Sequence, residues 1–199
     1  MNVDLLVISN VILWVLVIIL AFIIYALARQ IGVLYERVAP AGALAINSVL
    51  KVGDPAPRIP VLSLTGESLE IGVESATGRS RLLFFLSPDC PICKVLIPAL
   101  KSSAKAENNW LDVVLCSDGA EQDHAAYVKE YRLDGFPYVV SELLGISYGV
   151  AKLPYAILID EKGNIASMGI VNSKEHLESL FEAKERNVSS IQEYMQKRA

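Results

Sequence analysis

The sequence predicts an α/β domain with a mixed central sheet flanked by helices, preceded by one N-terminal transmembrane helix. Three observations support this prediction. The chain opens with a long uncharged apolar stretch, and short apolar runs of strand length then alternate with segments of helical periodicity. The alternation closes with a hairpin and a helix, an order typical of mixed sheets. The 199 residues suit one ordinary domain with such an appendage.

The apolar stretch at the N-terminus is expected to be a membrane anchor. No charged residue lies between Asp4 and Arg29, and only Ser9 and Asn10 interrupt the apolar run with polar groups. At about 1.5 Å per residue, the run is long enough to cross a hydrocarbon core of roughly 30 Å. A cleavable signal peptide is the alternative, but the N-terminus lacks Lys and Arg and the run is too long. We therefore interpret residues 1–28 as the anchor.

Three further regions follow the anchor. We interpret residues 29–51 as a linker, within which residues 38–47 carry small and weakly apolar side chains. The strand and helix patterns place the folded domain at residues 52–186. Residues 187–199 are polar and are interpreted as a C-terminal tail.

Short apolar or alternating runs bounded by turn-forming residues predict the strands. We expect them at residues 59–64, 68–72, 81–87, 111–116, 137–140, 155–160 and 164–170. The run at 81–87 reads RLLFFLS, and its continuous apolar character is typical of a strand that is buried on both faces of a sheet.

Apolar residues at helical spacing predict helices at residues 91–107, 121–132, 141–150 and 174–186. The side chains expected to face the core are Val95, Leu96, Ala99, Leu100 and Ser103 in the first helix, Ala125, Val128 and Tyr131 in the second, and Leu177, Leu180 and Phe181 in the last. Pro98 is expected to kink the first helix, and Asn172 or Ser173 to cap the last.

The composition argues against several classes of function. The formal net charge is −4, and no basic stripe is present, so we expect no nucleic-acid partner. Three cysteines are too few for a disulfide scaffold in a chain of this length. The only histidines are His124 and His176, so a histidine-rich metal site is not expected.

The sequence Cys90-Pro91-Ile92-Cys93 follows a predicted buried strand and opens a predicted helix. Unpaired N–H groups and the dipole at a helix N-terminus stabilise a thiolate, so a cysteine pKa there is expected to fall from about 8.5 toward neutrality. The spacing places the two thiols one turn apart, close enough to form a disulfide. Pro91 has no N–H to lose at the first helical position. We expect Cys90 to be the exposed nucleophile and Cys93 the buried resolving thiol.

Other interpretations of the cysteine pair stay open. A structural zinc site needs four ligands, and no second cysteine pair exists, so no metal is expected. A static structural disulfide has the same spacing. Asp89 either opposes thiolate formation at Cys90 by like-charge repulsion or caps the helix. No separate cofactor is expected, because the pair of Cys90 and Cys93 is itself redox-active.

A second signal lies at Leu153-Pro154, directly before the strand predicted at residues 155–160. In this architecture a cis-proline in that place packs beside the dithiol, and the backbone of Leu153 then pairs with an extended substrate strand. Cys116 ends another predicted strand and is interpreted as a small buried hydrophobic residue, with a third redox-active thiol as the alternative.

These residues together resemble the membrane-tethered, TlpA-type thioredoxin family. The resemblance rests on VGDPAP at residues 52–57, the strand followed by Cys90 and Cys93, and Leu153-Pro154 ahead of ILIDEKG. A closer resemblance is to the MauD family of methylamine utilisation proteins, through FFLSPDCPICK, GFPYVVS, KLPYAILIDEKG and SKEHLESLFEAKERNVSSIQEY. It extends through the anchor and the whole domain. It implies a thioredoxin-like fold and thiol–disulfide oxidoreductase activity.

The resemblance also implies a role and two partners. MauD-type proteins are thought to assist processing, disulfide formation and maturation of the small (β) subunit of methylamine dehydrogenase. That subunit is exported, rich in disulfides and carries a tryptophan-derived quinone. A multi-spanning membrane protein of the MauE type is the expected redox partner.

The chain departs from the wider thioredoxin pattern in two places. Asp89 replaces the usual Trp before the first cysteine, and the strand at 81–87 has no buried carboxylate that would take a proton from Cys93. The proton acceptor is therefore left open between water and Asp89. The redox direction is open as well, because oxidases, isomerases and reductases share this dithiol.

Two arguments about membrane orientation conflict. Arg29 and Arg37 follow the apolar run and no Lys or Arg precedes it, so the positive-inside rule predicts a cytoplasmic domain. A tethered dithiol domain is most useful where disulfides form. With the family resemblance, this second argument leads us to expect the thioredoxin-like domain in the periplasm.

Three rival functions were weighed. A thiol peroxidase needs Pro and Thr or Ser ahead of one cysteine; Ser87 lies three residues before Cys90, but Leu83 stands where that family has proline. A non-catalytic binding module or chaperone for the small subunit would make the cysteines dispensable. A copper-delivery protein would use both cysteines and His176, but that family prefers a wider cysteine spacing.

Overall fold

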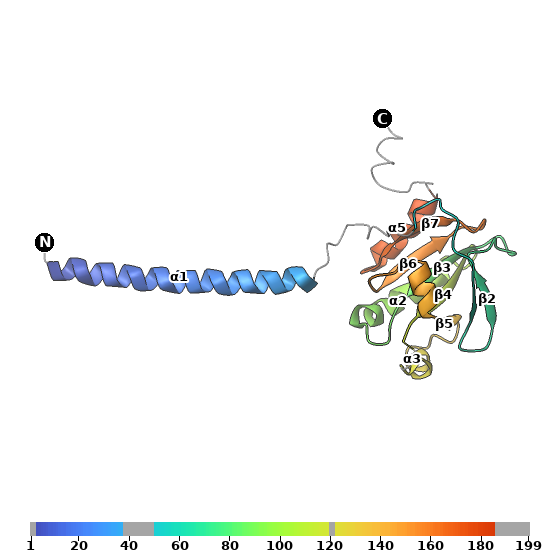
Figure 1. Ribbon diagram of the computed structural model, residues 1–199, viewed down its shortest axis with the longest axis horizontal. Helices are drawn as coiled ribbons and strands as arrows, with labels where there is room; N and C mark the ends of the chain where they lie inside the picture. The colour runs from blue at the N-terminus through green and yellow to red at the C-terminus, as the bar shows by residue number, and fades with distance from the viewer. Residues whose placement is uncertain (1–2, 38–49, 120–121, 186–199) are drawn as a thin grey trace, which may run out of the picture. The chain divides into compact units, whose positions relative to one another are not determined.

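The computed structural model describes residues 3–37, 50–119 and 122–185. The chain divides into two compact units, Met1–Ala43 and Leu44–Ala199 (Figure 1). The tail expected at residues 187–199 lies outside the described residues.

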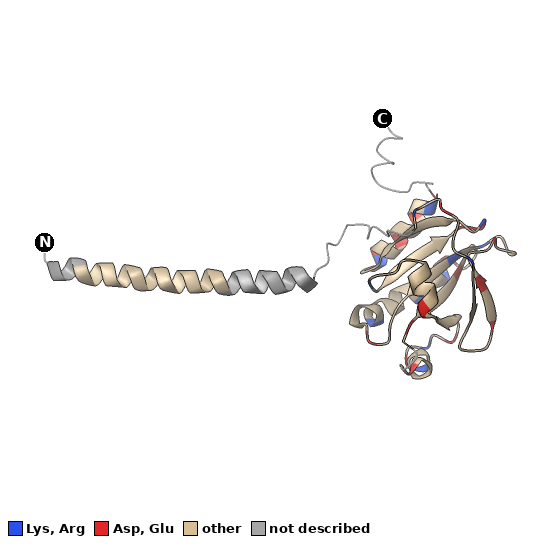
Figure 2. Cartoon of the chain, in the orientation of Figure 1, with Lys and Arg blue, Asp and Glu red and all other residues tan. Residues whose placement is uncertain are grey.

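The described part of the N-terminal unit is a single helix, α1 (Val3–Arg37). Its segment Val7–Tyr25 has a mean hydropathy of 3.0 and no buried side chain. Figure 2 shows no Lys, Arg, Asp or Glu along that segment. Its 19 residues span about 28 Å at 1.5 Å per residue, close to the thickness of a hydrocarbon core. The helix is therefore long and apolar enough to cross a membrane, as the sequence predicted.

The helix does not end where the anchor was expected to end. It continues beyond Ala28 to Arg37, so the first part of the linker expected at residues 29–51 is helical. The apolar pattern stops near Ala28, but helix formation does not require apolar residues, and no proline occurs before Pro40. The following part of that linker, up to residue 49, lies outside the described residues.

The folded unit is built on a five-stranded mixed sheet with the order β5-β4-β3-β6-β7. The strands are β3 (Ser80–Phe85), β4 (Leu111–Ser117), β5 (Tyr138–Val140), β6 (Tyr155–Ile159) and β7 (Ile165–Ile170). β3, β4 and β5 run parallel to one another. β6 pairs with β3 in the antiparallel sense, and β7 pairs with β6 in the antiparallel sense. A separate antiparallel hairpin consists of β1 (Ile59–Leu62) and β2 (Ser68–Ile71). The predicted mixed α/β sheet is confirmed.

Helices and the hairpin cover the two faces of this sheet (Figure 1). The helices are α2 (Pro91–Ala106), α3 (His124–Glu130), α4 (Glu142–Ser147) and α5 (Lys174–Glu185). Buried residues of α2, α3 and α5 form one hydrophobic cluster with the sheet, and those of α4 and the hairpin form a second. The central strand β3 contributes to both, with Leu82 and Phe84 in the first and Leu83 and Phe85 in the second. Successive side chains of a strand point to opposite faces, which explains the continuous apolar run.

The inward face of α2 differs from the expected one. Val95 is 79% exposed, although it was expected in the core, and Ala99 is only half-buried. The buried side chains are Cys93, Leu96, Ile97, Leu100 and Ser103. Helical periodicity leaves the rotation of a helix uncertain by one residue, and the complete burial of Cys93 decides it here. The helix runs through the exposed Pro98 as one element, and the expected kink stays a prediction.

The second helix is shorter than expected and is rotated. Residues 121–132 were expected to be helical with Ala125 inward, but α3 covers only His124–Glu130 and Ala125 is exposed. The Asp123 side chain accepts a hydrogen bond from the Ala126 N–H and starts the helix there. His124 and Tyr127 are its fully buried side chains. Val128 and Tyr131, which were expected to face inward, are half-buried and pack against the hydrophobic cluster under α2. The last helix has Leu177, Leu180 and Phe181 buried, as predicted.

One charged contact connects α5 to the sheet. The Lys184 ammonium lies 2.9 Å from the Glu161 carboxylate, donates to the Ser80 hydroxyl and sits 4.8 Å from the centre of the Trp110 ring. The hydrogen bond from Lys184 holds the pKa of the Glu161 carboxyl below its ordinary value. A lowered folded-state pKa stabilises the fold above the unfolded-state pKa, and this stabilisation is lost as pH falls through the folded-state pKa.

We expect Glu161→Gln to lower the free energy of unfolding of the folded unit by about 0.5 kcal/mol at neutral pH, because the pair is partly exposed and screened. The difference should shrink as pH falls below 4.5, the ordinary pKa of this carboxyl. It should disappear below the lower folded-state pKa, where the wild-type carboxyl is protonated in both states. Urea unfolding at neutral and acidic pH measures it. Glu130→Gln, at an exposed position without an ion pair among the described residues, is the control. A difference that persists in acid would contradict this account.

Candidate active site

The cysteine pair lies at one edge of the sheet, where three strands meet. The parallel strands β3 and β4 end at this edge, with Phe85 opposite Cys116. The antiparallel strand β6 begins there, with Tyr155 opposite Phe85. The segment that leaves β3 for α2 therefore lies beside the segment that enters β6.

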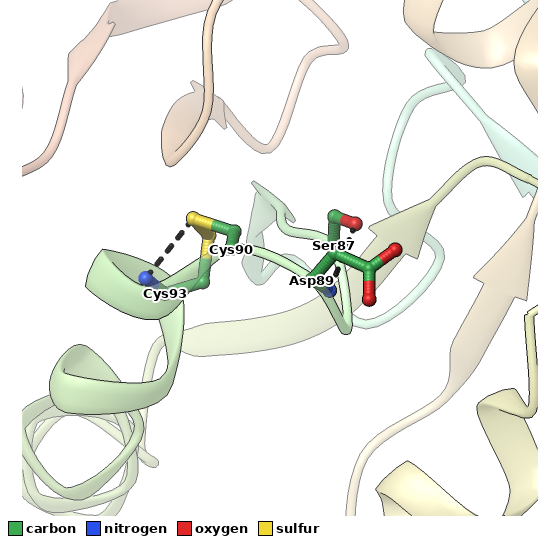
Figure 3. Close-up of a disulfide and its surroundings, with 4 residues drawn as sticks. All are labelled: Ser87, Asp89, Cys90 and Cys93. Carbon is green, nitrogen blue, oxygen red and sulfur yellow. Dashed lines mark hydrogen bonds between the residues drawn. A yellow bond between two sulfur atoms is a disulfide. The ribbon is translucent and has the colours of Figure 1, made fainter.

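Cys90 and Cys93 form a disulfide at the start of α2, with their Cα atoms 5.3 Å apart (Figure 3). Cys90 is the N-cap residue, and its sulfur accepts a hydrogen bond of 3.1 Å from the Cys93 N–H. Pro91 occupies the first helical position, where its missing N–H costs no helical hydrogen bond. After reduction, the same N–H is placed to stabilise a thiolate on Cys90.

The two sulfurs differ in their access to solvent. Cys93 is 0% exposed and belongs to the hydrophobic cluster beneath α2, whereas Cys90 is only half-buried and packs against that cluster. An incoming thiolate therefore reaches Cys90 and not Cys93. This asymmetry allows a disulfide to be opened from one side, with Cys93 as the leaving group.

Asp89 does not cap the helix, because the sulfur of Cys90 occupies that position. Its N–H donates to the Ser87 hydroxyl at 3.3 Å, and its carboxylate points away from the disulfide (Figure 3). The carboxylate accepts a hydrogen bond of 2.6 Å from the Gln122 amide. Sequence reasoning missed Gln122, which lies 33 residues away and in no motif. Water and Asp89 are the two candidates to accept a proton from Cys93, and the Asp89 carboxylate points away from both sulfurs.

The peptide bond between Leu153 and Pro154 is cis, as the sequence analysis expected. Pro154 directly precedes β6 and so lies at the same sheet edge as the disulfide. Leu153 is half-buried and packs against both hydrophobic clusters, the first of which also contacts Cys90. Within the described ranges, neither the N–H nor the C=O of Leu153 makes a hydrogen bond. Its backbone is therefore available to an extended ligand.

Cys116 is a free and buried thiol in β4. Its sulfur lies 3.8 Å from the Val114 carbonyl oxygen, to which the thiol donates. Burial raises the pKa of the Cys116 thiol above its ordinary value, which keeps it protonated and unreactive. The interpretation of Cys116 as a small buried hydrophobic residue agrees with this environment.

The structure does not assemble the metal sites that were weighed. His176 accepts a hydrogen bond from the Asn172 N–H at 3.3 Å at the start of α5. Over residues 3–37, 50–119 and 122–185, no three His, Cys, Asp or Glu side chains are grouped to hold a metal ion. A copper site made of Cys90, Cys93 and His176 is thus not formed.

A dithiol at the start of a helix, with one buried sulfur and a neighbouring cis-proline, defines a class of protein when it stands on this sheet. The class is that of the thioredoxin-fold thiol–disulfide oxidoreductases, and the chain is a thiol–disulfide oxidoreductase of this kind.

Comparisons with known proteins agree with this class. A model described as the AhpC/TSA family matches residues 52–188. The methylamine utilization protein MauD of Methylophilus methylotrophus is 41% identical over 195 residues, which cover 98% of this chain and 92% of that protein. The thiol-disulfide oxidoreductase ResA of Bacillus thuringiensis is 27% identical over 143 residues, covering 69% and 80%. The thioredoxin domain of a thiol-disulfide oxidoreductase from Bacteroides vulgatus has a TM-score of 0.56 at 22% identity, covering 70% of this chain and 99% of that domain. The chain belongs to the AhpC/TSA family and, over nearly its full length, to the MauD family of methylamine utilization proteins.

The charge of Asp89 yields a prediction for the redox pair. A carboxylate beside Cys90 disfavours a thiolate there, so Asp89→Asn should stabilise the reduced form and raise the reduction potential of the Cys90–Cys93 pair. The expected increase is about 10–30 mV, up to a tenfold change in the exchange constant. Equilibration against glutathione redox buffers measures the potential. Asp134→Asn, in the exposed loop before β5, is the matched control and should leave the potential unchanged. An unchanged or lower potential for Asp89→Asn would show that this charge does not act on Cys90.

Proposed function

We propose that this chain catalyses thiol–disulfide exchange during the maturation of the methylamine dehydrogenase small (β) subunit. The observation that carries the proposal is the half-buried Cys90 sulfur at the N-terminus of α2, in a chain with MauD-like sequence over nearly its full length. The subunit contains several disulfides that must form in the correct pairs. A membrane-tethered dithiol protein fits that requirement.

Exchange in the oxidising direction begins with a substrate thiolate. It attacks the Cys90 sulfur, the Cys90–Cys93 bond breaks, and Cys93 leaves as a thiolate that takes a proton from water. A second substrate thiolate then attacks the substrate sulfur of the mixed disulfide. This forms the substrate disulfide and releases Cys90 as a thiolate, which the Cys93 N–H stabilises. The substrate loses two electrons and the cysteine pair gains them. The reducing direction is the reverse sequence.

Substrate binding is assigned to the backbone of Leu153 and to the cis-proline that follows it. An extended substrate segment would pair with the N–H and C=O of Leu153, which make no hydrogen bond within the described chain. This pairing would hold the substrate sulfur at the sheet edge where Cys90 lies. Backbone pairing does not depend on a particular side chain, so it suits a substrate with several cysteines.

The proposal places the folded unit in the periplasm, with α1 in the membrane. An exported subunit forms its disulfides on that side. The Arg residues after the apolar segment argue for the opposite orientation by the positive-inside rule. A MauE-like protein with several membrane spans would exchange electrons with the Cys90–Cys93 pair.

Thiol peroxidase activity is the second candidate, because Ser87 lies three residues before Cys90, where the peroxidase motif has Thr or Ser. The observations favour exchange. Leu83 is buried within β3 at the place where the peroxidase motif has proline, and Cys90 is paired with Cys93 in a disulfide. A peroxide-consumption assay separates the two activities.

We expect Cys93→Ala to accumulate a mixed disulfide between Cys90 and the dehydrogenase small subunit, because the Cys90 thiolate still attacks a substrate disulfide and the Cys93 thiol that would break the resulting bond is absent. Non-reducing electrophoresis of membranes from cells that express the dehydrogenase measures this adduct. Cys90→Ala is the matched control and should form none, since Cys93 is fully buried. A Cys90→Ala chain that still supports assembly of active dehydrogenase would instead favour a binding module or chaperone.

The orientation is tested by labelling the reduced dithiol with a membrane-impermeant maleimide. In spheroplasts we expect Cys90 to be labelled without lysis of the inner membrane. The variant in which both Cys90 and Cys93 are Ser should remain unlabelled, because Cys116 is buried. Labelling that requires lysis would place the folded unit in the cytoplasm and would support the positive-inside argument.

A further inference from the structure

A cavity of about 190 Å³ lies beside the candidate active site. It opens at the sheet edge where β3 and β4 end, next to the segment that leads to the cis-proline. Its lining includes Cys116, Ser117, Ser141, Gly145, Val150 and Leu153. Leu153 therefore takes part in two features: its backbone is unpaired within the described chain, and it forms part of the cavity wall.

The cavity lies on the opposite face of the sheet from α2. Phe85 and Cys116 line it and belong to the hydrophobic cluster under α4 and the hairpin, and Val150, also in the lining, packs against that cluster. Leu86, which follows the end of β3, is the lining residue that belongs to the cluster under α2. Cys90 and Cys93 belong to the cluster under α2. Leu153 packs against both clusters, so it stands between the dithiol and the cavity.

This arrangement has a consequence for any extended segment that pairs with Leu153. Successive side chains of a strand point to opposite faces. When the cysteine of such a segment points toward Cys90 on the α2 face, the residue before or after it points toward the other face. The cavity lies on this other face, and Leu153, with which the segment pairs, forms part of its wall.

The chemistry of the wall indicates what the cavity accepts. Apolar side chains of Phe85 and Val150 and the protonated Cys116 thiol form much of it, with Ser117 and Ser141 contributing hydroxyl groups. The two charged residues of the lining, Asp118 and Lys152, are exposed, so a charged side chain against the apolar part of the wall would lose its hydration without an ion pair there. A cavity of about 150 Å³ is large enough for benzene, so this one admits an aromatic ring.

The α4 helix keeps this space open through a glycine. Gly145 lines the cavity, and a Cβ atom built on it meets no atom within 4 Å. Glycine weakens a helix relative to alanine, and nothing in the packing around this position excludes a side chain. Gly145 therefore lines the cavity at a position where a larger side chain meets no clash at its Cβ atom.

We propose that this cavity is a substrate subsite that binds a large uncharged side chain, aromatic or branched aliphatic, on the residue adjacent to the reacting cysteine of the substrate. The inference rests on the proposed exchange function. The backbone of Leu153 binds any extended segment, and the cavity adds a preference for particular cysteines among the several in a substrate.

The test uses the oxidised full-length chain in detergent and synthetic peptides with one cysteine. The peptides differ only in the residue before or after the cysteine, which is Phe, Leu, Gly or Asp. The second-order rate constant for opening the Cys90–Cys93 disulfide is measured for each. We expect Phe or Leu at one of the two flanking positions to react about tenfold faster than Gly or Asp, equivalent to 1.4 kcal/mol.

A variant that fills the cavity locates this preference. Gly145→Leu should reduce the ratio between the Phe and Gly peptides to below about twofold, because its side chain occupies the subsite. Gly135→Leu is the matched control. A Cβ atom there also meets no atom within 4 Å, but Gly135 lies in the loop before β5 and does not line the cavity. It should keep the wild-type ratio.

The outcomes separate the subsite from the proposed function. If peptides react but the flanking residue has no effect in the wild type, the subsite is wrong and the exchange function stands. A preference that survives in Gly145→Leu also overturns the subsite. If dithiothreitol reduces the pair but no peptide reacts, the exchange function itself is wrong. The wild-type comparison needs no variant, so it decides the question even if Gly145→Leu does not fold.

Discussion

The burial of Cys93 is the constraint on which the rest of the site depends. Because this side chain has no exposure, it fixes the rotation of α2 about its axis. That rotation places Cys90 at the N-cap, where its sulfur accepts the Cys93 N–H, and turns Val95 toward solvent. Two chemically identical thiols thereby acquire different roles. One is a buried leaving group, and the other is accessible and stabilised as a thiolate.

A single sheet edge brings the remaining parts of the site together. β3 and β4 end there and β6 begins there, because β6 pairs with β3 in the antiparallel sense. The dithiol therefore lies on one side of the Leu153-Pro154 segment and the cavity on the other. The dithiol, the Leu153 backbone and the cavity therefore meet at one edge of the sheet. The proposed substrate, a folding protein with several cysteines, fits this arrangement.

Much of the fold was predictable because its signals are local. Residues 82–86 are all apolar because β3 faces two hydrophobic clusters, and the cysteine pair follows shortly after. The differences from prediction concern which face of a helix is buried and where a helix begins or ends. Val95 and Ala125 were placed inward because periodicity does not fix rotation within one residue, and the start of α3 depends on the Asp123 cap. The linker expected after Ala28 begins as helix because hydrophobicity and helicity end at different places.

Local patterns were sufficient to predict the long apolar N-terminal helix, the order of strands and helices, the Cys90–Cys93 pair at a helix N-terminus and the proline before β6. Each depends on residues that are neighbours along the chain, so spacing and composition suffice to identify them. Only the tertiary structure decided that Asp89 binds Gln122 and that Gly145 opens onto a cavity beside Leu153. Asp89 and Gln122 lie 33 residues apart, and the cavity wall combines residues of β3, β4 and α4 with the segment before Pro154. This contact and this cavity depend on how the helices pack against the two faces of the sheet, which no local pattern specifies.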